Sequence, residues 1–389
     1  MAAKKFKNKN GIFAAVGAAT GLGNAFRFPA LCVKYGAAFI LVYALVLVVV
    51  CFPLLCAELS FGTKKLSGRG AKIWAVIMRA AAANSALIAL YYGVIAAKIG
   101  SASLSFALFP DAESGGVYLF VFALIFVLVA AYALLKGGAK ALSLSGKVSV
   151  ILSLALFSSL SIAGLIRGGA FSSFNAAAIK GGAIWADALG QSLLALSLAA
   201  GVMPSYAKTL PKPFSVPFSA LKIVVANFIM CVLTTLSILP FYSFLSATVG
   251  VTCALNAYSQ VIFSLFKSAA AVRIFGAALF GVLTVVAVHS LASLAYPAVS
   301  RLSFNFRLAP LVFCVLAACL APLFTLGDMR VLSACDKIAC SVNAVALAVA
   351  ESLFFALTAA YKGGNRRFKR HLSTENHSFA EVGTASRKQ

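Results

Sequence analysis

Long apolar runs separated by short polar stretches follow one another from residue 11 to residue 361. The hydrocarbon core of a bilayer is about 30 Å thick, and an α-helix crosses it with roughly 20 residues. Runs of this length predict ten helices, over residues 11–33, 36–60, 82–101, 116–134, 146–166, 184–208, 218–245, 271–300, 308–326 and 335–361. The pattern therefore predicts an all-α integral membrane protein.

Two of the ten predicted helices contain residues that interrupt a helix. The first holds Gly17, Gly21 and Gly23 before Pro29, and the sixth holds Gly190, Gly201 and Pro204. In lipid, broken backbone is tolerated where it lines a cavity or is covered by protein. Interruptions in helices one and six match a unit of five helices repeated once, which often marks a transporter's binding site. Close helix packing through glycine is the alternative explanation.

The repeat predicts ten transmembrane helices as a five-plus-five inverted repeat with broken helices one and six. The transporter core is expected over residues 11–361, with residues 11–166 as the first repeat and residues 184–361 as the second. Residues 1–10 are then a short N-terminal segment. Residues 362–389 form a polar, basic tail that we predict to be disordered.

Composition supports the membrane assignment, and charge adds an orientation. Hydrophobic residues make up 62% of the 389 positions, charged residues 11%, and the mean hydropathy is +0.99. The formal net charge is +24, and 24 of the 33 Lys and Arg residues lie on one side of the ten-helix path. These 24 basic residues lie in segments 1–10, 62–81, 135–148, 208–222, 301–307 and the tail beyond Tyr361. The intervening loops hold Asp111, Glu113 and Asp328.

The positive-inside rule places the basic loops in the cytoplasm. We therefore expect a multi-pass protein of the cell membrane (plasma or inner) with both termini cytoplasmic. Residues 62–79 suit a cytoplasmic loop or a surface helix. Orientation, with attraction to anionic membrane lipid, explains the charge without a nucleic-acid partner.

Few residues in the chain suit catalysis or a tightly bound metal. The nine cysteines are scattered without a C-x-x-C pair and are expected to act as small apolar residues. His289 is the one histidine within a predicted helix, with no triad or ligand cluster around it in the sequence pattern. The chain is therefore not expected to be an enzyme or to carry a cofactor.

Residues 11–62 resemble the first two helices of the neurotransmitter:sodium symporter family. The resemblance rests on GLGNAFRFP at 21–29, GAAF at 36–39 and FPLLCAELSFG at 52–62. Weaker matches follow in order: ALYYGVIAA at 89–97, GQSLLALSLAAG at 190–201 and HSLASLAYP at 289–297. Members usually carry one or two further helices, so the chain looks like a short ten-helix form of the bacterial, amino-acid-transporting type. The resemblance implies sodium-coupled symport of an amino acid by alternating access.

The resemblance also implies two sodium sites and a substrate site. The first sodium site would use the Ala19 carbonyl, the Asn24 side chain, the Ala195 carbonyl and Asn227. The second would use the carbonyls of Gly17, Thr20 and Val286 with His289 and Ser290. The substrate would lie against Gly21, Leu22, Gly23, Ile88, Tyr92, Leu194, Ser197, Ala200 and Leu294. Its carboxylate would meet the Tyr92 hydroxyl and the amides near Leu22 and Gly23.

Several positions depart from the family pattern. Gly21 stands where monoamine-transporting members have an aspartate, which favours a substrate that brings its own carboxylate. Ala195 stands where many members have a sodium-binding hydroxyl, and His289 replaces a hydroxyl of the second site. Imidazole is a poor ligand for a hard cation but titrates near neutral pH. Proton coupling through His289 is thus an alternative, as is an imidazole that turns aside to bond a backbone carbonyl.

The gates are the last feature that the resemblance implies. Arg27 and Asp336 correspond to the family's outer gate pair, and two snorkelling charges at the membrane interface are the alternative. No inner gate pair is predicted, because Lys5 and Asn305 depart from the pattern. Glu58 is expected to tie helix two to broken helix six. A non-transporting sensor remains a further alternative, and the sequence makes no prediction of oligomeric state.

Overall fold

The computed structural model describes residues 11–109, 116–166, 176–210, 214–239, 251–301 and 308–359. The predicted cytoplasmic segment 1–10 and basic tail 362–389 lie outside the described residues, as do Asp111, Glu113 and the inner-gate positions Lys5 and Asn305. Within the described ranges every regular element is helical.

Seven helices are long and apolar enough to cross a membrane among the described residues. They span Ala38–Thr63, Gly68–Leu108, Val117–Ile166, Val216–Ile238, Ala269–Val299, Ala309–Leu326 and Met329–Ala359. The chain is therefore a multi-pass membrane protein. The first and sixth predicted helices are missing from this set because each is divided into short pieces, and the fourth and fifth are merged into one long element.

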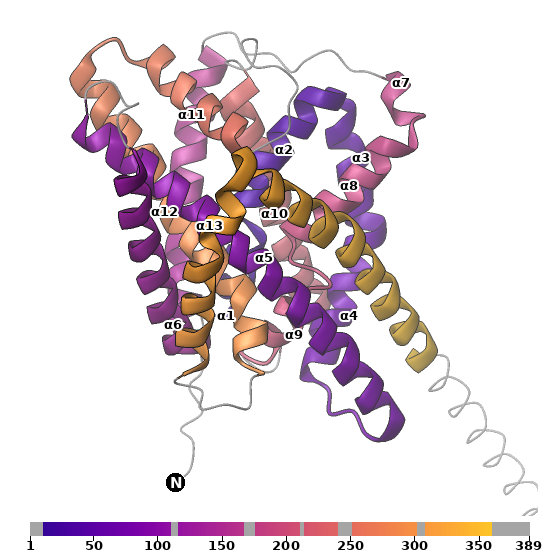
Figure 1. The fold of residues 1–389 in the computed structure, drawn as a ribbon. Coiled ribbons are helices and arrows are strands. Elements are labelled where there is room, and N and C mark those ends of the chain that lie inside the picture. The colour runs from indigo at the N-terminus through magenta and orange to yellow at the C-terminus, as the bar shows by residue number, and fades with distance from the viewer. Residues whose placement is uncertain are drawn as a thin grey trace, which may run out of the picture.

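The elements follow the predicted order with a few changes (Figure 1). They are α1 (Gly11–Ala19), α2 (Leu22–Tyr35), α3 (Ala38–Val46), α4 (Phe52–Thr63), α5 (Gly68–Leu108), α6 (Val117–Ile166), α7 (Ala176–Ile179), α8 (Gly182–Ala195), α9 (Val202–Ala207), α10 (Val216–Ile238), α11 (Val251–Leu265), α12 (Ala269–Val299) and α13 (Ala309–Asp336). Two π-helical segments, Leu47–Cys51 and Lys337–Asn343, join α3 to α4 and extend α13. The last helix then continues to residue 359.

Three differences from the predicted elements have local causes. The basic stretch after residue 62 is helical from Gly68 and continuous with the third predicted helix. The fourth and fifth predicted helices meet at Gly138, whose φ of 62° bends the chain without a loop. Helix α11 was not predicted, because its apolar face, which includes Tyr258 and Val261, is only half of a short amphipathic helix.

The centre of the bundle is formed by α1, α5, α6, α10 and α12. Helix α12 packs against both α5 and α6, and α1 packs against α6 and α10. The approach of α1 to α6 is very close, since a Cβ on Gly17 would lie 2.7 Å from the Gly146 Cα. Helices α7 and α11 lie at one end of the bundle and α9 at the other (Figure 1). The two divided helices therefore cross the middle of the molecule.

Candidate functional site

The first helix break lies between Ala19, which ends α1, and Leu22, which begins α2. Gly21 is extended there (φ −81°, ψ −165°), and its carbonyl accepts the Asn24 N–H over 3.1 Å. The first amides of a helix have no partner within the helix, so α2 points free N–H groups at the break. A side chain at Gly21 would collide with the Ser290 hydroxyl of α12. The break is thus closed on one side by α12, and a Cβ at Gly21 would displace the Ser290 hydroxyl.

The second break separates α8 from α9 over residues 196–201. Ser197 (φ 50°), Ala199 (φ 54°) and Gly201 (φ 69°) are all in the left-handed region. For a residue other than glycine this conformation costs roughly 1–3 kcal/mol, and such strain concentrates at functional sites. The sixth predicted helix is therefore unwound over six residues, as glycine and proline there indicated.

Direct contacts join the two breaks. The Ser197 hydroxyl donates to the Ala18 carbonyl over 3.4 Å, and Gln191 Nε2 donates to the Gly23 carbonyl over 3.1 Å. On the other side, Glu58 Oε1 accepts the Ala199 N–H over 2.8 Å. The predicted link between helix two and broken helix six is thus present. Glu351 lies beside Glu58, and both carboxyls are fully buried.

Two cavities meet at the breaks. The outer cavity has a volume of about 350 Å³ and the inner one is much smaller, at about 20 Å³. Both are lined by Leu22, Gly23, Tyr92 and Leu194, so the inner cavity is the floor of the outer one. The inner cavity is lined in addition by Ala18, Gly21, Ala195, Ser197, Ser290 and Leu294. No acidic residue of the described ranges lines the inner cavity.

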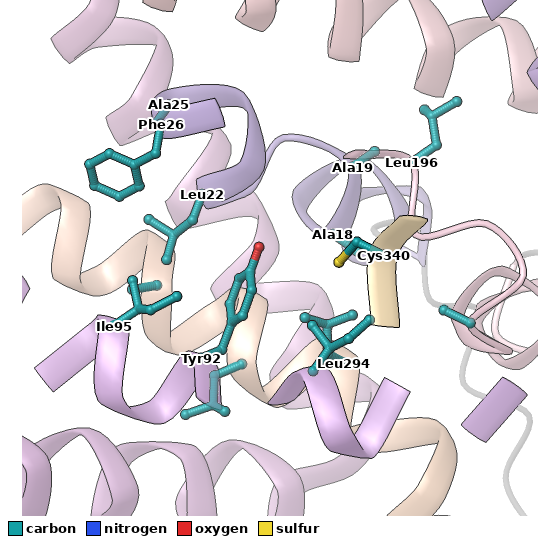
Figure 2. Close-up of a cluster of buried hydrophobic side chains, with 14 of the residues drawn as sticks. Ala18, Ala19, Leu22, Ala25, Phe26, Tyr92, Ile95, Leu196, Leu294 and Cys340 are labelled. Atoms are coloured by element: carbon teal, nitrogen blue, oxygen red, sulfur yellow. The ribbon is translucent and has the colours of Figure 1, made fainter. Parts of the chain in front are cut away.

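Seven of the nine predicted substrate residues line this inner cavity: Gly21, Leu22, Gly23, Tyr92, Leu194, Ser197 and Leu294. The other two, Ile88 and Ala200, are buried but line neither cavity. Figure 2 shows the Tyr92 ring among Leu22, Ile95 and Leu294, with its hydroxyl pointing toward the break between α1 and α2. That hydroxyl has no hydrogen bond to a described residue. It is therefore free to bind a ligand.

The residues predicted for the first sodium site converge on one carbonyl. The amides of Asn24 and Asn227 both donate to the Ala19 carbonyl, over 3.0 and 2.7 Å. Asn227 Nδ2 also lies 3.4 Å from Asn24 Oδ1, and both side chains are buried. Ala195 is the last residue of α8 and lines the adjoining inner cavity. Tyr43, which the sequence did not single out, donates to Asn227 Oδ1 over 2.7 Å.

The residues predicted for the second sodium site are arranged differently. His289 Nδ1 lies 2.8 Å from the Ser145 hydroxyl, and His289 Nε2 lies 3.3 Å from the Ser293 hydroxyl. Ser293 in turn accepts the Tyr206 hydroxyl over 2.9 Å. The imidazole thus bonds two serines where a backbone carbonyl was the predicted alternative.

The hydroxyls of Thr20 and Ser290 are buried without a hydrogen-bond partner. Ser290 faces Gly21 and lines the inner cavity. Val286 is buried one turn before Ser290 in α12. Ser293 lies one turn after His289 in α12, whereas Ser145 and Tyr206 carry no signal in the sequence, because only the packing of α6, α9 and α12 brings them to this site.

The predicted outer gate residues line the outer cavity without touching. Arg27 and Asp336 both border it, yet they form no ion pair in this structure. Asp336 Oδ1 accepts the Tyr91 hydroxyl over 2.9 Å, and Arg27 Nη1 is buried without a partner. Farther out, Lys34 of α2 pairs with Asp187 of α8 over 3.0 Å. This ion pair lies near the surface, since the Lys34 side chain is 44% exposed.

Known proteins resemble this chain in sequence and in fold. The sequence model of the Sodium:neurotransmitter symporter family matches residues 4–109. An uncharacterized sodium-dependent transporter of Bacillus subtilis (strain 168), YhdH, is 29% identical over 259 residues. That alignment covers 59% of this chain and 57% of YhdH, so the chain spans little more than half of this curated relative.

The fold was matched over a longer range. MhsT, solved in complex with L-phenylalanine, superposes with a TM-score of 0.79 at 24% identity. The match covers 91% of this chain and 90% of MhsT. The all-helical fold is therefore shared with MhsT, and the resemblance to the sodium:neurotransmitter symporter family predicted from residues 11–62 is confirmed.

Proposed function

We propose that this chain is a secondary active transporter, not an enzyme, that carries an amino acid together with sodium by alternating access. One observation supports this proposal most strongly. Two unwound helix segments meet at one buried cavity, beside two asparagines that both donate to the Ala19 carbonyl. Irregular backbone at membrane depth, lining a cavity, is the arrangement expected of a transporter's binding site. The ten-helix inverted repeat and cytoplasmic termini are part of this proposal.

The chemistry of the inner cavity favours a zwitterionic amino acid. The free amides at the start of α2 and the Tyr92 hydroxyl are donors suited to a carboxylate. An amine without a carboxylate would need an acidic partner, and the lining residues include none. Leu194 and Leu294 provide apolar walls for a side chain. We therefore propose amino acids with apolar side chains as the substrate class.

Sodium is proposed to bind at the first site, between α1, α2, α8 and α10. A side-chain amide presents either its NH₂ group or its oxygen after a half-turn, so Asn24 and Asn227 can turn oxygen toward a cation. Together with the Ala19 and Ala195 carbonyls, they would form a set of hard oxygen ligands. The ion would hold the broken ends of α1 and α8 together, which orders the adjoining substrate cavity.

The outer cavity is proposed as the entry path. Arg27 and Asp336 border it and do not pair with each other in this structure. Pairing of these two residues after the substrate binds would close that path. The Lys34–Asp187 pair joins α2 to α8, so these two helices would move as one body during the closure.

Thermal unfolding of the purified protein tests this proposal directly. A ligand that binds only the folded state raises the unfolding midpoint. We expect L-phenylalanine or another apolar amino acid to raise the midpoint in sodium buffer and not in potassium buffer. The Asn24→Ala variant should lose this response.

The matched control is Asn256→Ala on the exposed side of α11, which removes the same side chain and should keep the response. Equal stabilisation in sodium and potassium would contradict sodium coupling. If no amino acid that is tested raises the unfolding midpoint, this result would contradict the transport proposal and favour a sensor.

A further inference from the structure

His289 stands where the family resemblance places a hydroxyl ligand of the second sodium site. Its imidazole is buried between α1, α6 and α12, and both ring nitrogens are engaged by the Ser145 and Ser293 hydroxyls. One ring nitrogen of a neutral imidazole donates and the other accepts, so these two bonds use the full capacity of the ring. No free pair of electrons remains on the ring for a cation.

The ring also fills the available space. Gly17 of α1 has no side chain at the ring, and a Cβ there would come within 2.6 Å of His289 Nε2. On the α6 side, a Cβ on Gly146 would come within 3.1 Å of His289 Cε1. Two glycines on neighbouring helices thus make room for the imidazole, and van der Waals contact closes the space around it.

Ser290 is the one predicted side-chain ligand of this site besides the ring, and its hydroxyl faces Gly21 and the inner cavity. Sodium is a hard cation that prefers several oxygen ligands, whereas imidazole suits softer metals. The residues present at the second site therefore do not fit sodium.

We infer that this chain binds one sodium ion per transport cycle, at the Asn24–Asn227 site, and that His289 replaces the second ion as a fixed structural bridge. This inference rests on the proposed function. The bridge runs from Ser145 of α6 through His289 and Ser293 of α12 to Tyr206 of α9. A dissociable ion would connect these helices only while bound, but the imidazole connects them throughout.

One consequence concerns the driving force. Each coupled ion multiplies the attainable accumulation of substrate by the sodium gradient across the membrane. Coupling to a single ion lowers that limit by one power of the gradient. The transporter would then need less sodium for each cycle and would concentrate its substrate less.

Direct counting of bound ions tests the inference without relying on transport. Purified full-length protein is saturated with ²²Na⁺ in the presence of the amino acid that stabilises it most, and bound sodium per protein is measured. We expect one sodium per wild-type protein, with a Hill coefficient of one. The His289→Ser variant replaces the ring with a hydroxyl and frees space, so two sodium ions and a Hill coefficient above one are expected.

The matched control is Ser293→Ala, which removes a bond to the imidazole but keeps the ring and should still bind one sodium. Two sodium ions on the wild-type protein would overturn the inference, whatever the His289→Ser variant does. One sodium on both wild type and a folded His289→Ser variant would show that the ring is not what excludes the second ion, which also overturns it. If neither protein binds sodium, the proposed function itself fails, and this outcome is distinct from the other two.

Discussion

Asn227 of α10 donates its side-chain amide to the Ala19 carbonyl over 2.7 Å, at the point where α1 ends. A carbonyl at a helix C-terminus has no partner within the helix and carries part of the negative end of the helix dipole. The contact therefore satisfies an acceptor that would otherwise be buried without a partner in the middle of the protein. An ion at this position would take over the same electrostatic role.

Tyr43 positions Asn227, and its removal should weaken sodium binding. The Tyr43 hydroxyl donates to Asn227 Oδ1 over 2.7 Å. After the half-turn that aims Oδ1 at sodium, the amide presents Nδ2 to the Tyr43 hydroxyl, which then accepts. In Tyr43→Phe that N–H loses its acceptor, at a cost of about 1 kcal/mol, whereas without sodium Oδ1 keeps the Cys231 thiol as a donor. We expect the sodium concentration for half-maximal stabilisation to rise about fivefold, while the effect of the amino acid at saturating sodium is unchanged. Titration of the unfolding midpoint with sodium measures the shift.

The control for Tyr43 is another buried tyrosine. Tyr258 donates to the Ala25 carbonyl over 2.9 Å and makes no hydrogen bond to either asparagine side chain within the described residues. Tyr258→Phe should lower the unfolding midpoint without changing the sodium dependence. If both variants shift the sodium titration equally, the effect is general loosening of the bundle, and Tyr43 has no specific role at the site.

Much of the fold could be predicted, because each membrane helix is a long apolar run in the sequence. The breaks in helices one and six were equally visible, since Gly21 and Gly201 are residues with a clear local effect on the backbone. Helix α11 was not visible, because its polar positions hide a short buried face. The start of α5 at Gly68 was also missed, since charged residues form a surface helix as readily as a loop.

The site was predicted only where a motif carried it. GLGNAFRFP placed Gly21, Leu22, Gly23 and Asn24 in one segment, and the structure brings that segment to Asn227 and Tyr92. Of the two partners of His289, Ser293 follows one helical turn later, but Ser145 could not be predicted. Ser145 lies 144 positions away in the chain and reaches the ring only because α6 and α12 pack together. Such contacts depend on the tertiary structure, and local sequence patterns do not encode them.

Gly21 should not tolerate even the smallest side chain. An alanine Cβ there would collide with the Ser290 hydroxyl, but it would lie 3.4 Å from the Ser290 Cβ. We therefore expect Gly21→Ala to lower the unfolding midpoint and the double variant Gly21→Ala/Ser290→Ala to restore it. The unfolding midpoint of the single and double variants measures this rescue. Ser290→Ala alone is the control, and a double variant no more stable than Gly21→Ala would contradict the steric explanation.

Glu58 should stabilise the unwound segment of the sixth helix through its single contact with the backbone. Its Oε1 accepts the Ala199 N–H, and Ala199 itself has a positive φ. Glu58→Ala would leave a buried N–H without a partner, at a cost of about 1–3 kcal/mol. Glu58→Gln keeps an oxygen acceptor and should stay within about 1 kcal/mol of the wild type. Thermal unfolding of the two variants measures the difference, and equal midpoints would exclude the backbone contact as the main role of Glu58.

Tyr92 should recognise the carboxylate of the substrate and nothing else. Its hydroxyl points toward the first break and has no hydrogen bond to a described residue. A hydrogen bond to a charged group contributes about 1.5–3 kcal/mol, so Tyr92→Phe should weaken binding of an amino acid at least about tenfold. The amide of the same amino acid has no charged carboxylate, so wild type and variant should bind it with similar affinity.

Tyr91→Phe is the matched control, because the Tyr91 hydroxyl is already used by Asp336. Ligand titrations of the unfolding midpoint with both compounds give the two ratios. An equal loss for the amino acid and its amide would place the Tyr92 hydroxyl away from the carboxylate and would move the substrate to another part of the cavity.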